Sequence, residues 1–130
     1  MSGASVKPLD GCRILLAEDE PLLLIDLNNM LVLAGAVIVG PAASVQSALF
    51  LAKSETVHCG VLNVKLKDGD VDPVAELLYR GGKGLVFVTS LNVKDKLLRN
   101  WPSSKVLEKP ASEKDLISAA VTACRSCRGA

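Results

Sequence analysis

The sequence predicts an α/β fold in which helices cover both faces of one parallel, five-stranded sheet. Five short apolar runs alternate with five segments of helical periodicity, which is the pattern of a doubly wound sheet. The apolar runs contain few polar residues, as strands buried on both faces require. The 130 residues, 49% of them hydrophobic, have the length and apolar content of a single domain with its own core.

The first strand is predicted over residues 13–17, after a flexible lead over residues 1–10. Pro21 suits the first position of the helix that follows, where a missing N–H costs nothing. Gly35 is expected to end that helix. The inward face has a spacing of 3.6 residues and comprises Leu23, Leu27, Met30, Leu31 and Ala34.

The later elements follow from the same signals. Strands are predicted over residues 36–40, 59–62, 85–88 and 105–107, and helices over residues 45–54, 73–80, 91–101 and 113–124. Ser44 and Asp72 are expected to cap the second and third helices, and Ser112 the last. Residues 67–70 have the composition of a turn. The helix over 91–101 is the weakest element, because it is short and Pro102 ends it.

Two apolar features have two interpretations each. Leu22 and Leu24 widen the apolar stripe of the first helix, so they either enlarge its buried face or form a surface for a partner protein. Trp101 either anchors a partner at the surface or folds back onto the core.

Charge and hydropathy exclude some classes of protein. The formal net charge is +1 and the Lys and Arg residues are scattered, which argues against a nucleic-acid partner. Apolar runs are too short to span a bilayer, and the first ten residues lack the apolar core of a signal peptide. We therefore expect a cytoplasmic protein without a membrane partner.

The four cysteines are interpreted as reduced thiols. Cys12 and Cys59 begin predicted strands, where cysteine usually behaves as a small buried hydrophobe. Cys124 and Cys127 form a C-x-x-C, but a zinc or redox role would need a second pair or a nearby histidine. The single histidine, His58, precedes a strand and is expected at the surface.

Polar side chains follow four of the apolar runs. Glu18 and Asp19 follow the first strand, Asn63 the third, Thr89 the fourth and Lys109 the fifth. In a parallel sheet these strand ends meet in one crevice. A carboxylate pair suits Mg²⁺, a lysine holds an oxyanion, and a hydroxyl can bond the same anion. Together they describe a phosphoryl-transfer pocket that lacks only its nucleophile.

These motifs resemble the receiver domain of two-component response regulators over nearly the whole chain. The matching stretches are ILLAEDE at residues 14–20, VLNVKLKDG at 61–69, FVT at 87–89 and LEKP at 107–110. The resemblance implies a flavodoxin-like fold with strand order 2-1-3-4-5, a receiver domain over residues 11–127 and a short tail over 128–130.

The resemblance also implies roles for the polar residues. Asp19 would bind Mg²⁺ directly, Glu18 would act mainly through water, and Asn63 and the backbone carbonyl of Lys65 would complete the metal site. Thr89 would be the switch hydroxyl. The side chain of Lys109 would contact the phosphoryl group, and its bond to Pro110 would be cis.

Three features depart from the family pattern. The phosphoacceptor of the family is an aspartate, whereas Asn63 is an amide that cannot form an acyl phosphate and should weaken Mg²⁺ binding. Val106 stands where the family usually has an aromatic switch residue. Val88 and Ser90 replace two residues of the Phe-Ala-Thr-Gly motif of a single-domain receiver subgroup, which the chain otherwise resembles.

Three hypotheses of function follow. The first is a non-enzymatic pseudo-receiver, monomeric or weakly dimeric, that docks onto a histidine kinase, a phosphotransfer protein or another receiver. The second is a phosphorylatable response regulator, in which Asn63 is an introduced substitution or Asp68 or Asp70 accepts the phosphoryl group. The third is a small-ligand-binding domain, which the acidic turn at residues 18–20 disfavours because it repels phosphate.

Overall fold

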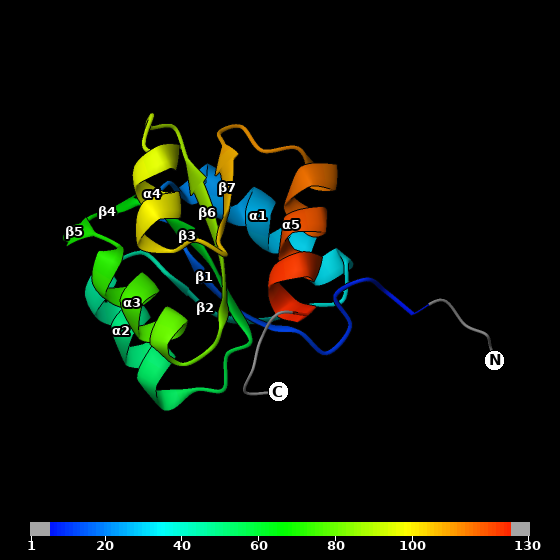
Figure 1. Ribbon diagram of the computed structural model, residues 1–130. Coiled ribbons are helices and arrows are strands. Elements are labelled where there is room, and N and C mark those ends of the chain that lie inside the picture. Colours follow the sequence, from blue (N-terminus) through cyan, green and yellow to red (C-terminus); the bar gives the residue numbers. More distant parts are fainter. Residues whose placement is uncertain (1–5, 126–130) are drawn as a thin grey trace.

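The computed structural model describes residues 6–125, which form one twisted parallel sheet between two layers of helices (Figure 1). The sheet order is β2-β1-β3-β6-β7, so the predicted order of the five strands is confirmed. The strands are β1 (Arg13–Ala17), β2 (Val37–Ala42), β3 (Cys59–Asn63), β6 (Gly84–Thr89) and β7 (Lys105–Glu108). All pairings between these strands are parallel.

Helices cover both faces of the sheet. α1 (Pro21–Leu33) and α5 (Glu113–Arg125) lie on one face, and α2 (Val45–Ser54), α3 (Asp72–Arg80) and α4 (Lys94–Asn100) lie on the other (Figure 1). Among residues 6–125, no helix is long and apolar enough to cross a bilayer.

The alternation of side chains along the buried strands creates two cores. Leu15, Leu62 and Phe87 face α2, α3 and α4, whereas the neighbouring residues Ile14 and Val61 face α1 and α5. Each strand is thus apolar on both faces, which explains the continuous apolar runs in the sequence.

The approach of α5 to the sheet depends on a glycine. A Cβ added at Gly84, the first residue of β6, would collide with the backbone of Ala123 in α5. The contact fixes the end of α5 against the start of the central strands.

Residues 1–10 were predicted to be flexible, and this prediction is wrong for Leu9. This side chain is buried, and its backbone N–H donates to the Ala34 carbonyl at 2.8 Å. The few apolar residues of this segment form no helix or strand pattern, so the burial of Leu9 is not visible in the sequence. Residues 1–5, Cys127 and the predicted tail over residues 128–130 lie outside the described residues.

Several local predictions are refined. Ser44 and Ser112 accept backbone N–H bonds as N-caps, from Ser47 at 3.1 Å and Asp115 at 3.0 Å. Asp72 does not cap its helix, because α3 begins at Asp72 itself and Val71 is the N-cap. The turn predicted over residues 67–70 belongs to a hairpin of β4 (Lys65–Leu66) and β5 (Gly69–Asp70).

The partner-surface interpretation is wrong for Trp101. Its side chain is only 3% exposed, its ring centroid lies 5.5 Å from that of Phe87, and its Nε1 donates to Glu76 at 3.2 Å. Trp101 therefore anchors the short α4 to the core. Leu22 is 80% exposed, whereas Leu24 is half-buried against the α1 and α5 side of the core.

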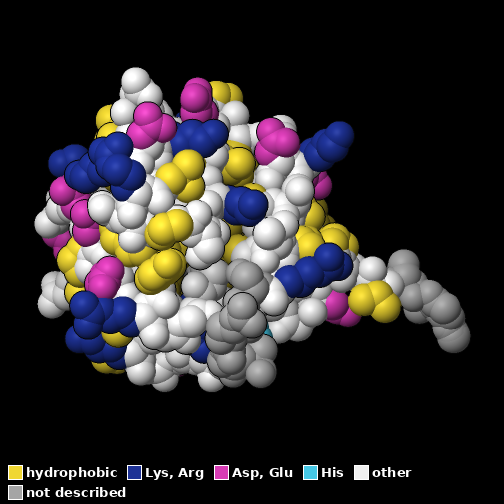
Figure 2. Space-filling view, viewed as in Figure 1, with side chains coloured by type: hydrophobic (Ala, Val, Ile, Leu, Met, Phe, Trp, Pro, Cys, Tyr) yellow, Lys and Arg dark blue, Asp and Glu magenta, His cyan; other side chains and the backbone are white. Residues whose placement is uncertain are grey.

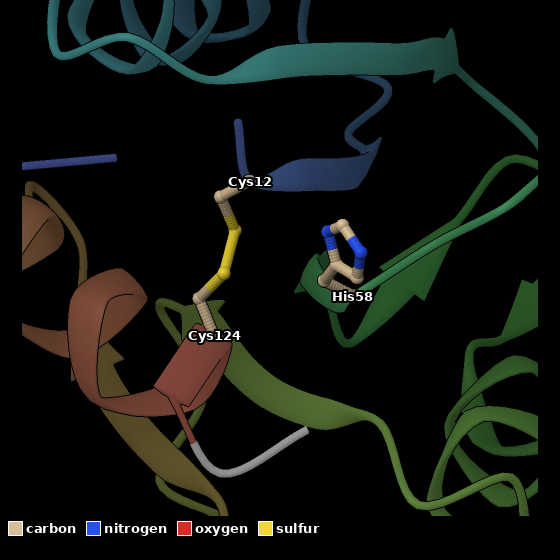
Figure 3. A group of neighbouring side chains, drawn as sticks. All are labelled: Cys12, His58 and Cys124. Carbon is tan, nitrogen blue, oxygen red and sulfur yellow. A yellow bond between two sulfur atoms is a disulfide. The ribbon is translucent and has the colours of Figure 1, made fainter. Parts of the chain in front are cut away.

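The expectation of reduced thiols is wrong for Cys12 and Cys124, which are joined by a disulfide (Figure 3). These residues are 112 positions apart, and only the packing of α5 against the sheet brings them together. His58 is half-buried rather than at the surface, and its Nδ1 accepts the Arg13 backbone N–H at 2.9 Å.

Candidate functional site

The carboxyl ends of β1, β3, β6 and β7 converge on one cavity, as the sequence predicted from the polar residues that follow these strands. The cavity measures about 240 Å³ and is lined by Asp19, Glu20, Asn63, Lys65, Thr89, Ser90, Leu91 and Lys109. Glu18 lies beneath it with no exposed surface. All the residues to which the resemblance assigned a role at the pocket therefore lie together.

Glu18 is a buried carboxylate held by the turn that follows β1. Its Oε2 accepts the backbone N–H groups of Asp19 and Glu20, each at 3.1 Å. Its Oε1 lies 3.2 Å from the Lys109 Nζ. Burial raises the pKa of Glu18, and the Glu20 N–H and the Lys109 ammonium oppose that rise.

The Asn63 side chain donates its amide N–H₂ to three oxygens. Its Nδ2 lies 3.0 Å from Glu18 Oε2, 3.2 Å from Asp19 Oδ1 and 2.8 Å from the Lys65 carbonyl oxygen. A carbonyl oxygen and carboxylates only accept hydrogen bonds, so this orientation is the one in which the amide satisfies them. A flipped amide would place its own oxygen against three acceptors.

These three oxygens belong to the groups that the family resemblance assigned to Mg²⁺. Hard oxygen ligands suit the ion, but the amide directs its hydrogens at them instead of contributing a further oxygen. The residues as arranged do not fit Mg²⁺. Binding the ion would require the Asn63 side chain to turn and lose its three hydrogen bonds.

Lys109 and Thr89 both interact with other residues of the protein, Lys109 through ion pairs and Thr89 through a hydrogen bond. The Lys109 Nζ forms a second ion pair with Glu20 at 3.1 Å. The Thr89 Oγ1 accepts the Leu91 N–H at 3.0 Å, and the residue is 1% exposed. The peptide bond from Lys109 to Pro110 is cis, as expected. Sequence reasoning missed Glu20 as a partner of Lys109, although its place in the acidic turn was a signal.

Asp68 and Asp70, the alternative phosphoacceptors, are held outside the cavity. The Asp68 carboxylate accepts the N–H groups of Val45 at 2.6 Å and Gln46 at 3.1 Å, at the start of α2. The Val45 hydrogen bond is the main cause of a lowered Asp68 pKa. Asp70 forms an ion pair with Lys65 at 3.1 Å.

Comparisons with known proteins agree with this arrangement. No protein-family model matches the sequence. The chain is 34% identical over 111 residues to the transcriptional regulatory protein PdtaR of Mycobacterium tuberculosis, an alignment that covers 82% of the chain and 54% of PdtaR. The chain thus spans about half the length of the curated relatives it matches.

Solved structures show the same fold. A response regulator receiver protein of Sinorhizobium medicae superimposes with a TM-score of 0.82 and 24% identity, covering 92% of the chain and 99% of that protein. The response regulator PhyR of Brucella abortus gives a TM-score of 0.73 and 26% identity, covering 87% of the chain and 47% of PhyR.

Proposed function

We propose that the chain is a receiver domain of the two-component response-regulator family, and that it is a pseudo-receiver that signals by binding a protein partner. In this proposal Asn63 occupies the phosphoacceptor position and accepts no phosphoryl group. The partner is a histidine kinase, a phosphotransfer protein or another receiver. The likeness to receiver domains favours this proposal over the third hypothesis, a small-ligand-binding domain.

The observation that carries the proposal is the direction of the Asn63 amide. Its N–H₂ group donates to Glu18, Asp19 and the Lys65 carbonyl and so separates three oxygens that only accept hydrogen bonds. The amide thereby takes the place of a cation among these oxygens. The lone pair of an amide nitrogen is delocalised into its carbonyl group, so Asn63 lacks the nucleophilic carboxylate that attack on phosphorus requires.

The alternative is a phosphorylatable regulator, with a substituted Asn63 or with Asp68 or Asp70 as acceptor. The contacts of Asp68 and Asp70 disfavour either of them as the acceptor. Asp68 would have to leave the N-terminus of α2, and Asp70 would have to leave Lys65. Either change would cost hydrogen bonds or an ion pair before any phosphoryl transfer.

The proposed partner surface is the outer side of α1. Leu22 is 80% exposed and Leu33 71%, and they lie with the exposed Ile25 and Val32 on the side of the helix away from the core. An apolar cluster of this kind on a helix is a common docking surface. On the face shown in Figure 2, basic and acidic side chains surround hydrophobic ones.

The test uses purified histidine kinases and phosphotransfer proteins of the host, phosphorylated with labelled ATP. We expect the wild-type chain to bind at least one of them and gain no label, while Asn63→Asp gains label from the same partner. Label on the wild-type chain, or no binding to any partner, would contradict the proposal.

A matched pair of variants locates the surface. Leu22→Asp should weaken binding at least tenfold. Phe50→Asp should not, because Phe50 is 68% exposed but lies on α2, on the opposite face of the sheet. Equal binding by both variants would place the partner elsewhere.

A further inference from the structure

A second cluster of chemically active side chains lies at the end of the sheet opposite the phosphoacceptor position. Cys12 precedes β1, His58 precedes β3, and Cys124 is near the end of α5 (Figure 3). One ligand atom from each residue lies within 4.8 Å of the others. Because the strands are parallel, this amino-end cluster is separated from the cavity by the length of the strands.

The donor types suit a borderline-soft divalent cation. Two cysteine thiolates and an imidazole are ligands that Zn²⁺ binds in tetrahedral sites, whereas Mg²⁺ prefers oxygen. The sequence alone does not predict a zinc site, because the C-x-x-C has no second pair of cysteines and no histidine nearby. The fold brings one further cysteine, Cys12, and His58 to Cys124 from positions far away in the sequence.

Burial strengthens the case for a metal. Cys12 is only 2% exposed and Cys124 is half-buried, so the reduced thiols stay protonated unless a cation neutralises the thiolates. The Nδ1 lone pair of His58 accepts the Arg13 backbone N–H at 2.9 Å, so metal binding through this nitrogen requires that hydrogen bond to be released. Cys127, three residues beyond Cys124 in the C-x-x-C, lies outside the described residues.

We propose that the reduced amino-end cluster of Cys12, His58 and Cys124 binds one Zn²⁺, and that the disulfide is its metal-free alternative. A phosphine reduces the disulfide with two electrons and becomes the phosphine oxide, while water supplies the oxygen atom and the two protons that give two thiols. Zinc binding then releases the thiol protons. The metal would hold the end of α5 to the start of β1, as the disulfide does.

The test compares reduced and oxidised forms of the full chain. The chain is reduced with a phosphine, freed of metal with a chelator, and titrated with Co²⁺ and Zn²⁺ under nitrogen. We expect one equivalent of Co²⁺, with thiolate-to-cobalt charge-transfer absorption that Zn²⁺ abolishes, and no such absorption with the disulfide form. Absence of this absorption in the reduced chain would overturn the proposal without involving any variant.

Variants assign the ligands. Cys12→Ser, Cys124→Ser and His58→Gln should each weaken Zn²⁺ binding at least tenfold, measured by competition with a chromophoric chelator. Cys59→Ala is the matched control, since it removes a buried thiol next to His58 in the sequence but outside the cluster. Unchanged affinity in both Cys12→Ser and Cys124→Ser, or loss of affinity in Cys59→Ala alone, would refute this ligand set.

Discussion

At the scale of single residues, the chemistry of the pocket depends on two hydrogens of Asn63. A carboxylate at this position would repel Glu18 and Asp19 and would need a cation to hold it there. The amide donates to both and to the Lys65 carbonyl, so these oxygens have a hydrogen-bond donor in place of an ion.

The first prediction concerns metal affinity. Asn63→Asp should bind Mg²⁺ at least tenfold more tightly than the wild type, because it adds a charged oxygen ligand and removes the competing donor. Titration calorimetry measures both affinities. Asn63→Ala is the control, and it should not reach the affinity of the aspartate variant. Equal Mg²⁺ affinity of wild type and Asn63→Asp would show that the amide does not obstruct the site.

The second prediction concerns Asp68, whose pKa is lowered by the Val45 N–H bond. A lowered pKa means that the folded state favours the carboxylate. The stabilisation is therefore complete above the ordinary pKa of 3.8 and is lost as the pH falls through the lower, folded value. Asp68→Ala should lower the urea midpoint at neutral pH, and the difference from wild type should shrink in acid. A difference that is independent of pH would contradict this origin.

At the scale of elements, short α4 depends on tertiary packing. It has seven residues, too few for a stable isolated helix, and Trp101 fastens its end to Phe87 and Glu76. Periodicity could place Trp101 on the same side as Leu97, but it could not show whether that side met the core. That side of α4 does meet the core, because the Trp101 indole contacts residues that are distant in the sequence.

The third prediction follows from this anchor. Trp101→Ala should reduce the free energy of unfolding by about 3–5 kcal/mol, the usual cost of removing a large buried aromatic side chain. Chemical denaturation followed by circular dichroism measures the loss. Leu22→Ala is the control and should change stability by less than about 0.5 kcal/mol, because Leu22 is exposed. Similar losses in both variants would contradict the core role of Trp101.

The fourth prediction concerns the contact between β6 and α5. Gly84→Ala should destabilise the fold by about 1–3 kcal/mol, because the new methyl group meets the Ala123 backbone. Gly81→Ala is the control, since a Cβ there finds its nearest atoms at 3.5 Å and should be tolerated. Thermal unfolding of both variants distinguishes them, and an unchanged melting temperature in Gly84→Ala would disprove the close approach.

At the scale of the whole molecule, the features that could be predicted from the sequence are those set by residues close together in the chain. Each strand is an apolar run with a polar residue after it, so the sheet and the convergence of Glu18, Asn63 and Lys109 could be predicted from neighbouring residues. The amino-end cluster could not, because Cys12, His58 and Cys124 meet only after the chain has folded. The anchoring of Asp68 at α2 escaped prediction for the same reason.

The two ends of the sheet thus carry different chemistry. The carboxyl ends hold a pocket of oxygen ligands closed by an amide, and the amino ends hold sulfur and imidazole. The proposed partner surface on α1 lies on one face between them. In the proposed function, the chain keeps a recognition surface on α1 while Asn63 makes the phosphoacceptor position chemically silent.

The most direct test of the silent phosphoacceptor position needs no kinase. The wild type and Asn63→Asp are incubated with acetyl phosphate and Mg²⁺, and their intact masses are measured. The wild-type mass should stay unchanged, while Asn63→Asp gains the mass of one phosphoryl group. A Mg²⁺-dependent gain of one phosphoryl group by the wild-type chain would contradict the account.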